Sequence, residues 1–176
     1  MWGDDVKLIV SDRELTIPEM QRDALQFIDL SKLKIAGCVG CFGCWTKTPG
    51  RCVIRDDAVK VYPLIAQSDR LLYVSRVRYG SYDTPMKRML ERAIPVQQAF
   101  IRLVKGETHH VQRDVKPKQA VIVGYGDLSE EEKAIFRQLV ARNANNMSFE
   151  SYRVVFTTED MLMQTVEKEI LAWERS

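Results

Sequence analysis

The alternation of strand-like and helix-like segments along the chain is the feature that most constrains its fold. Runs of apolar and β-branched residues predict five strands, at residues 6–10, 25–30, 70–77, 119–124 and 151–157. Helical periodicity or a capping signal predicts helices over residues 56–67, 83–93, 129–146 and 162–173. Such alternation is typical of a parallel sheet with helices on both faces. We therefore expect one α/β domain over residues 1–176.

Two of the helix starts are marked by their residues. Asp83 or Thr84 can cap a helix whose first turn contains Pro85, a residue that suits the first helical position. Ser129 and Glu132 have the spacing of a capping box. Each start comes soon after a predicted strand, so both strands must end in loops.

The expected topology is a flavodoxin-like, doubly wound, five-stranded parallel sheet in the order 2-1-3-4-5, within a three-layer α/β/α arrangement. In such a sheet, ligands bind beyond the carboxyl ends of the strands, where the strand order reverses between the first and third strands. The candidate binding loops are residues 11–16, 75–83 and 124–128.

The four cysteines lie within fifteen consecutive residues, at Cys38, Cys41, Cys44 and Cys52, with the spacing C-x2-C-x2-C-x7-C. A closely spaced C-x2-C-x2-C run can bind three corners of a four-iron, four-sulfur cluster, and a further thiolate can bind the fourth. Structural zinc more often uses two separated C-x2-C pairs. An unligated surface loop is the third interpretation. The loop follows the second strand directly, so we expect it beside the reversal of strand order.

Composition limits the partners and the compartment. The chain has 26 Lys and Arg against 24 Asp and Glu, which argues against a basic face for nucleic acid. The uncharged apolar runs are far shorter than the about 20 residues that a membrane helix needs. The acidic amino end lacks a secretory signal. These features predict a cytoplasmic protein that binds neither nucleic acid nor membrane, in which disulfides are not expected.

Four stretches resemble the flavodoxin-like family of NAD(P)H-dependent FMN reductases and, within it, the iron-sulfur flavoproteins. They are IDLSKLKIAGCVGCFGCWTKTPGRCVIRDD, SRVRYGSYDTPMKRMLERAIP, GETHHVQRD and VIVGYGDLSEEEKAIF. The resemblance implies an oxidoreductase that passes electrons from a nicotinamide donor through FMN to a small-molecule or protein acceptor. It also implies a four-iron cluster on the four cysteines and a homodimer or homotetramer.

The resemblance further implies a flavin site in the candidate loops. The family usually has Ser-Pro-Val-Tyr-aromatic-Gly-Ser beside the flavin ring, and this chain has Arg76 and Arg78 in place of the proline and first tyrosine. The implied cofactor-binding residues are Ser11, Arg13, Thr16, Ser75, Arg76, Val77, Arg78, Tyr79, Gly80, Ser81, Gly124, Tyr125 and Gly126. No catalytic residue is assigned.

The amino end is shorter than in this family, where a long helix binds the FMN phosphate at its amino end. Only fourteen residues separate Val10 from Leu25, which leaves room for a short helix at residues 17–24. We expect a reduced phosphate site that uses Ser11, Arg13 and Thr16. The missing contacts would come from Arg76 and Arg78 or from another subunit.

Two residue pairs have competing interpretations. His109 and His110 are predicted in a loop before the fourth strand, where they are either structural or positioned to donate to a flavin or quinone oxygen. Neighbours on an extended chain point to opposite sides, so at most one faces a site. Asp56 and Asp57 are expected to cap a helix.

The alternative functions are a flavin-free iron-sulfur electron-transfer protein and a non-enzymatic remnant that uses the fold for subunit or partner binding.

Overall fold

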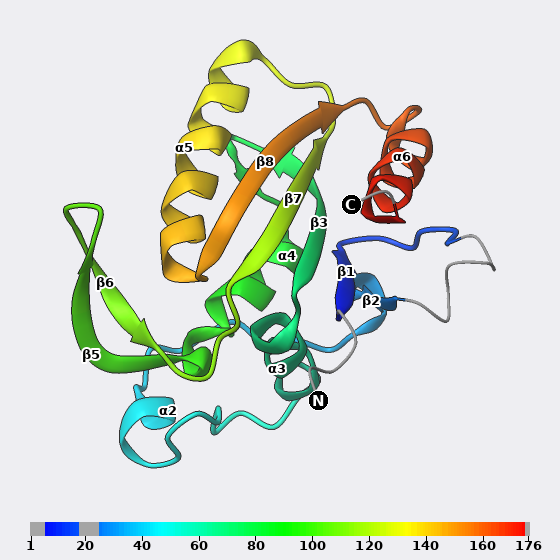
Figure 1. Cartoon of the computed structure of the whole chain (residues 1–176). Helices are drawn as coiled ribbons and strands as arrows, with labels where there is room; N and C mark the ends of the chain where they lie inside the picture. Colours follow the sequence, from blue (N-terminus) through cyan, green and yellow to red (C-terminus); the bar gives the residue numbers. More distant parts are fainter. Residues whose placement is uncertain (1–5, 18–24, 175–176) are drawn as a thin grey trace.

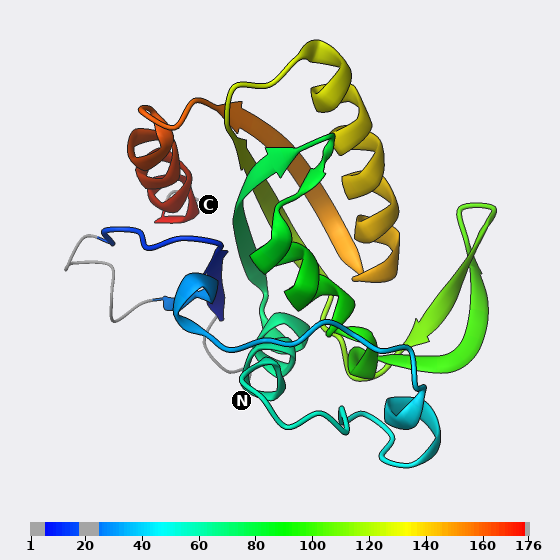
Figure 2. The ribbon, with the colours of Figure 1, turned by 180° about the vertical axis from the view of Figure 1, so that it is seen from behind.

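The computed structural model of the chain describes residues 6–17 and 25–174 (Figure 1; Figure 2). Its central sheet consists of β2 (Gln26–Asp29), β1 (Lys7–Ser11), β3 (Arg70–Arg78), β7 (Lys118–Tyr125) and β8 (Phe149–Thr157), in that spatial order. Each of these strands pairs in parallel with its neighbour. Taken in chain order, they are the five predicted strands, and the predicted order 2-1-3-4-5 is confirmed.

The helices divide between the two faces of this sheet (Figure 1). The first face is covered by α3 (Ala58–Gln67), α4 (Thr84–Glu91) and α5 (Glu130–Asn146). The second face is covered by α6 (Leu162–Glu174) and by Leu15 and Ile17 after β1. The segment 18–24, which contains most of the predicted short helix, lies outside the described residues.

Alternate residues of β3 explain why this strand is apolar throughout. Leu71 and Tyr73 are buried among the helices of the first face, whereas Leu72 and Val74 are buried against the second face. Successive side chains of a strand point to opposite faces, so a strand covered on both faces needs a continuous apolar run. Neither face of β3 is open to solvent over these residues, so no polar alternation is seen there.

The predicted helix starts are confirmed. The Asp83 carboxylate accepts a hydrogen bond from the backbone N–H of Thr84 at the start of α4. Ser129 and Glu132 form the complete capping box at the start of α5. Three shorter helical turns complete the described helices: η1 (Leu30–Lys32), α2 (Gly43–Thr46) and η2 (Ile94–Val96).

A projecting β-hairpin was not predicted from the sequence. It consists of β5 (Gln97–Val104) and β6 (Glu107–Gln112), joined by the turn at Lys105 and Gly106 (Figure 1). Both turn residues have positive φ, 51° and 82°, as a two-residue hairpin turn requires. The prediction that His109 and His110 lie in a loop is therefore wrong, because their segment pairs with β5.

None of the described helices is long and apolar enough to cross a bilayer.

Candidate functional site

The carboxyl ends of the parallel strands meet at one edge, which we call the carboxyl edge, seen at the top of Figure 1 for β3, β7 and β8. Asp12, the residue after β1, is buried there. Its Oδ2 accepts hydrogen bonds from the Ser75 hydroxyl at 3.1 Å and from the backbone N–H of Arg76 at 2.6 Å. Its Oδ1 accepts one from the Tyr125 hydroxyl at 2.9 Å. One carboxylate thus ties together the ends of β1, β3 and β7.

The pKa values of these groups follow from burial. Burial raises the pKa of Asp12 above its ordinary value, although the hydrogen bonds from Arg76, Tyr125 and Ser75 oppose that increase. Burial, together with the Asp12 charge, raises the pKa of Tyr125 to about 12. Tyr125 therefore keeps its proton at neutral pH, and its hydroxyl donates a hydrogen bond to Asp12.

Two arginines share one carboxylate above this network. Arg13 Nη1 lies 2.6 Å from Glu159 Oε1, and Arg76 Nη2 bonds to Glu159 Oε2. The guanidinium carbons of Arg13 and Arg76 lie 5.7 Å and 5.6 Å from the centre of the Tyr125 ring. The hydrogen bond from Arg13 is the main reason why the pKa of Glu159 is lowered. Arginine, tyrosine and glutamate from four strand ends thus form one cluster.

The loop after β3 is a tight hairpin. Val77 and Arg78 of β3 pair with Tyr82 and Ser81, the two residues of β4 (Ser81–Tyr82). Tyr79 and Gly80 form the turn, with φ of 52° and 70°. The Tyr79 side chain is 90% exposed, and its backbone N–H donates to Glu132 Oε1 at 3.0 Å. The capping box of α5 therefore also holds this turn.

The structure brings only some of the sequence-predicted flavin residues together. Arg13, Arg76 and Tyr125 form the cluster, with Ser75 beneath them. Arg78 instead faces Asp83, with Arg78 Nε 3.5 Å from Asp83 Oδ2. The remaining predicted residues are distributed as follows: Ser11 is buried and accepts a hydrogen bond from the Arg13 N–H, Thr16 is exposed, Val77 and Gly124 are buried against each other, Ser81 is half-buried, and Gly126 follows β7 with φ of 137°.

Sequence reasoning missed two residues of this site, Asp12 and Glu159. Asp12 lies in the candidate loop 11–16 but is absent from the predicted site residues, and its side chain turns into the sheet. Glu159 follows the fifth strand, whose loop was not among the candidates. The available signal was topological, because all carboxyl ends of a parallel sheet meet at one edge.

The cysteine loop lies elsewhere. Beyond η1 the chain extends along α3 and α4 and reaches the end of the sheet where the strands begin (Figure 2). There the Trp45 indole N–H donates to the Gln97 carbonyl at 3.0 Å, and the Cys52 N–H donates to the Tyr62 hydroxyl at 3.2 Å. The expectation that this loop lies beside the reversal of strand order is therefore wrong. The extended segment 33–42 after η1, which already contains Cys38 and Cys41, leads the chain away from that point.

Arg92 fixes both ends of the cysteine loop. Its side chain is fully buried; Nη1 donates to the Ala36 carbonyl at 2.9 Å, and Nη2 donates to the Ile54 carbonyl at 3.1 Å. Both nitrogens also bond to the Asp56 carboxylate, at 2.7 Å and 3.0 Å. Burial would raise the pKa of Asp56, but the hydrogen bonds from Arg92 and from backbone N–H groups outweigh burial and lower it.

The expected capping role of the aspartate pair is found for Asp56. Its Oδ1 accepts from the Ala58 N–H at 3.1 Å, at the start of α3. Asp57 makes no side-chain cap and instead accepts from the Lys34 N–H at 2.9 Å. Asp56 Oδ2 accepts from the Ala36 N–H at 2.9 Å, so both carboxylates bind the extended segment that leads to the cysteines.

The four cysteines are free; Cys38 and Cys41 are exposed, and Cys44 and Cys52 are half-buried. Burial raises the pKa of the Cys44 thiol, and charge on the other three sulfurs would raise it further. Four thiols in one loop are chemically suited to iron. Within residues 6–17 and 25–174, however, no three Cys, His, Asp or Glu side chains are grouped to hold a metal ion.

The two histidines point to opposite sides of β6, as the sequence analysis expects of neighbours on an extended chain. His109 lies between Asn146 Oδ1, 2.9 Å from Nδ1, and Glu107 Oε2, 3.0 Å from Nε2. The His110 ring lies 4.7 Å from the Trp45 ring, centre to centre. One histidine thus contacts α5 and the other contacts the cysteine loop.

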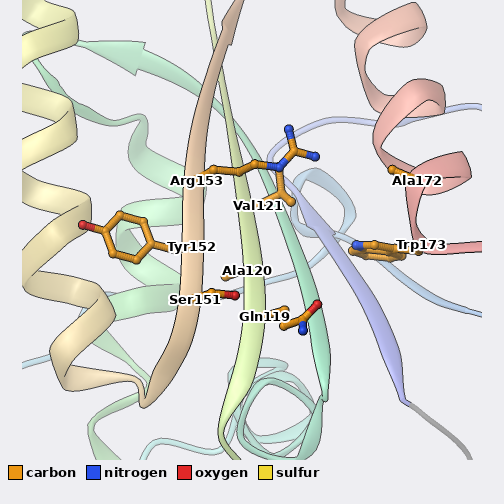
Figure 3. Close-up of a pocket in the computed structure, with 8 residues that line it drawn as sticks. All are labelled: Gln119, Ala120, Val121, Ser151, Tyr152, Arg153, Ala172 and Trp173. Atoms are coloured by element: carbon orange, nitrogen blue, oxygen red, sulfur yellow. The ribbon is translucent and has the colours of Figure 1, made fainter. Parts of the chain in front are cut away.

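A separate hollow of about 300 Å³ lies between α6 and the strands β7 and β8 (Figure 3). Arg153 and Trp173 border it, and Arg153 forms an ion pair with the buried Glu169. Gln119 and Ala120 place the hollow toward the beginning of β7. It contains none of the sequence-predicted site residues.

Comparisons with known proteins place this geometry in context. No family model matches the chain. An iron-sulfur flavoprotein of Archaeoglobus fulgidus is 28% identical over 161 residues, which cover 78% of this chain and 71% of that protein. An iron-sulfur flavoprotein of Methanocaldococcus jannaschii is 28% identical over 75 residues, 43% of this chain and 38% of that protein. The second match thus spans well under half of the relative.

Solved structures share the fold at low sequence identity. An NAD(P)H:quinone oxidoreductase from Methanothermobacter marburgensis superimposes with a TM-score of 0.57 and 9% identity, covering 96% of both chains. An FMN-dependent NADH-azoreductase from Bacillus anthracis gives a TM-score of 0.53 and 11% identity, covering 93% of this chain and 95% of that one. The resemblance seen in the sequence is confirmed: the chain has the flavodoxin-like fold of these reductases and is similar in sequence to iron-sulfur flavoproteins.

Proposed function

We propose that the chain is a flavoprotein oxidoreductase that binds FMN at the carboxyl edge and passes electrons from NADH or NADPH to a small-molecule or protein acceptor. The observation that carries the proposal is the 28% identity to an iron-sulfur flavoprotein over 161 residues. The fold supports it, because doubly wound sheets bind their ligands at the carboxyl edge.

The residues at that edge suit FMN. Tyr79 offers an exposed aromatic ring beside the flexible-backbone residue Gly80, and aromatic rings stack favourably on other planar rings. Arg13 and Arg76 offer the bidentate donors that phosphate prefers. Bound FMN would accept a hydride and release electrons, while the protein would bind and orient it.

The proposal has three further parts. The protein is a homodimer or homotetramer, as the family resemblance implies. It works in the cytoplasm, since its four free thiols suit a reducing compartment. A four-iron cluster on Cys38, Cys41, Cys44 and Cys52 would add a second electron carrier, and iron and sulfide analysis of protein purified without oxygen tests for it.

Flavin binding and reduction test the function together. The protein, purified without oxygen, is titrated into FMN, and we expect the flavin fluorescence to be quenched to a saturating end point. NADH or NADPH should then bleach the visible flavin absorption, and admitted oxygen should restore it. Tyr79→Ala should weaken binding of both FMN and riboflavin, whereas Tyr79→Phe, which keeps the ring, should not.

Protein that neither quenches FMN nor gains thermal stability from it would contradict the proposal. The cysteine loop favours one alternative, the flavin-free iron-sulfur electron carrier, since its four thiols are independent of the carboxyl edge. That alternative predicts stoichiometric iron and sulfide without flavin. The non-enzymatic remnant predicts a colourless protein that binds neither.

A further inference from the structure

Arg13, Arg76 and Glu159 form a closed charge cluster at the carboxyl edge. Both arginines bond to the same carboxylate, one to each oxygen, above the Tyr125 ring. We propose that the Glu159 carboxylate occupies the position of a phosphate-monoester group and that a phosphate monoester displaces it on binding. The inference rests on the proposed function, because FMN is the phosphate monoester that this function supplies.

The arginines are held in place by the network beneath them. Asp12 accepts the backbone N–H of Arg76 at 2.6 Å and the Tyr125 hydroxyl at 2.9 Å, which fixes both the strand end and the ring. The two guanidinium groups then lie over that ring, where cations are favoured. A preorganised pair of this kind binds an anion without first having to order its own side chains.

Glu159 is a weak occupant of this position. Its side chain is 49% exposed, and those of Arg13 and Arg76 are 43% and 34% exposed. Exposed ion pairs contribute little to stability, about 0–1 kcal/mol each, since water and salt screen them. A phosphate monoester brings up to two negative charges and three acceptor oxygens, against one charge and two oxygens for the carboxylate. The exchange of one anion for the other therefore favours phosphate.

Glu159 also explains how the arginine pair persists without ligand. Two guanidinium groups that share one ring would repel each other if no anion lay between them. The carboxylate supplies that anion from the segment that joins β8 to α6, where rotation of one exposed side chain releases it. Phosphate binding is thus opposed by a competitor that is part of the chain.

The phosphate could belong to FMN or to the 2′-phosphate of NADPH, and inorganic phosphate shares the same chemistry. The experiment compares Glu159→Gln, Arg13→Gln and Arg76→Gln with wild type, by flavin fluorescence and by thermal shift. We expect Glu159→Gln to tighten FMN binding about three- to tenfold, because it removes the competing charge and keeps the shape. Each arginine variant should weaken FMN binding, and riboflavin, which lacks phosphate, should respond to none of them.

The other arms identify the source of the phosphate. Inorganic phosphate should raise the melting temperature of Glu159→Gln more than that of wild type. A response of NADPH but not FMN, measured against NADH, would assign the site to the nicotinamide donor. Glu130→Gln and Arg55→Gln are the matched controls: both residues are exposed, and Glu130 is 84% exposed in its pair with Lys133. We expect neither control to change any affinity.

The outcomes separate this inference from the proposed function. If FMN binds equally well to wild type and all three variants, the flavoprotein function stands and the phosphate position is wrong. If no flavin binds but inorganic phosphate stabilises Glu159→Gln more than wild type, the phosphate position stands and the flavoprotein function fails. Equal responses of FMN and riboflavin to Glu159→Gln, or no response to phosphate in any form, overturn the inference.

Discussion

A charged side chain is buried at each end of the sheet, Asp12 at the carboxyl edge and Lys118 at the other end. Asp12 is buried at the carboxyl edge with three hydrogen-bond donors, so its charge is satisfied within the strands. Lys118 is buried at the other end, where its Nζ donates to the Lys116 carbonyl at 2.7 Å and the Ala66 carbonyl at 3.2 Å. Burial lowers the pKa of Lys118 to about 8. The protein therefore buries a cation that is close to losing its proton.

Lys118 gives stability a specific dependence on pH. Its pKa is about 8 in the folded chain and near its ordinary 10.5 when unfolded. Between these values the unfolded chain binds more protons, so the free energy of unfolding should rise with pH by at most about 3 kcal/mol. Lys118→Met should remove this rise in chemical denaturation from pH 7.5 to pH 10.5, roughly the window set by the two pKa values. Lys60→Met, at a side chain that is 77% exposed, should keep it.

A Lys118→Met profile that rises as steeply as the wild-type profile would show that another group titrates. The comparison uses differences between proteins at each pH, so it is insensitive to the general alkaline titration of surface groups.

Individual site residues could be predicted only where one loop carried the signal. Arg13, Arg76 and Tyr125 lie in loops that the strand order selects, and the structure brings them together. Glu159 lies 83 residues from Arg76 in an ordinary acidic stretch, so only the folded sheet pairs them. The proposed role of Arg78 in phosphate binding loses support, because Arg78 faces Asp83. Sequence spacing alone cannot show toward which side a long arginine turns.

At the scale of elements, local rules predicted most boundaries correctly. The strands and the capped starts of α4 and α5 follow from alternation and from capping residues that act within three positions. The β5–β6 hairpin was not predicted, because Lys105-Gly106 is a weaker turn signal than Asn-Gly or Asp-Gly and the flanking segments contain few β-branched residues. Its strands form a separate two-stranded sheet, so the alternation of strands and helices in the central sheet does not predict them.

Gly80 and Gly106 form a matched pair for testing turns. Both have positive φ, 70° and 82°, but a Cβ at Gly80 would lie 2.5 Å from Ile135 Cγ2, whereas nothing lies within 4 Å of one at Gly106. Gly106→Ala should therefore cost only the backbone strain, about 1 kcal/mol. Gly80→Ala should cost about 3 kcal/mol, since the overlap with α5 adds to the strain.

Urea denaturation measures both costs. Ile135→Ala in the Gly80→Ala background should recover only part of the loss, because it removes Ile135 Cγ2 but keeps the Cβ that would lie 2.6 Å from the new Cβ. Equal costs at the two glycines would mean that α5 can move away from the turn without loss of packing.

The whole molecule places its two candidate centres at opposite ends of the sheet. The order of the strands was predictable because helices alternate with the five strands of the central sheet from β3 onward. The position of the cysteine loop was not, because residues 33–42 have no helical or strand periodicity. The path of such an extended segment depends on tertiary contacts that no sequence pattern predicts. The main ones here are the hydrogen bonds from Arg92 to the Ala36 and Ile54 carbonyls.

The Arg92–Asp56 pair should control both stability and access to the thiols. The Arg92 side chain is 0% exposed, so Arg92→Met leaves the Asp56 carboxylate without its main partner, at a cost of about 3 kcal/mol or more. It also frees both ends of the cysteine loop. We expect Cys44 and Cys52 to react faster with a thiol reagent, measured under conditions in which the variant stays folded by circular dichroism.

Cys38 and Cys41 serve as internal references, since they are already exposed and should change little. The double variant Arg92→Met with Asp56→Asn should be less destabilised than the sum of the two single variants, because it leaves no unpaired charge. Unchanged reactivity at Cys44 and Cys52 in folded Arg92→Met would show that the loop holds its shape by its own contacts.

The short helix α4 lies between the carboxyl edge of the sheet and the cysteine loop. Its N-cap residue is Asp83, whose backbone N–H donates to the Arg76 carbonyl at 2.9 Å, and its C-cap residue is Arg92, which binds the cysteine loop. Eight helical residues span only about 12 Å, too short a length to bend appreciably. A single short helix therefore lies between the strand end that carries Arg76 and the residue that binds both ends of the loop with all four cysteines.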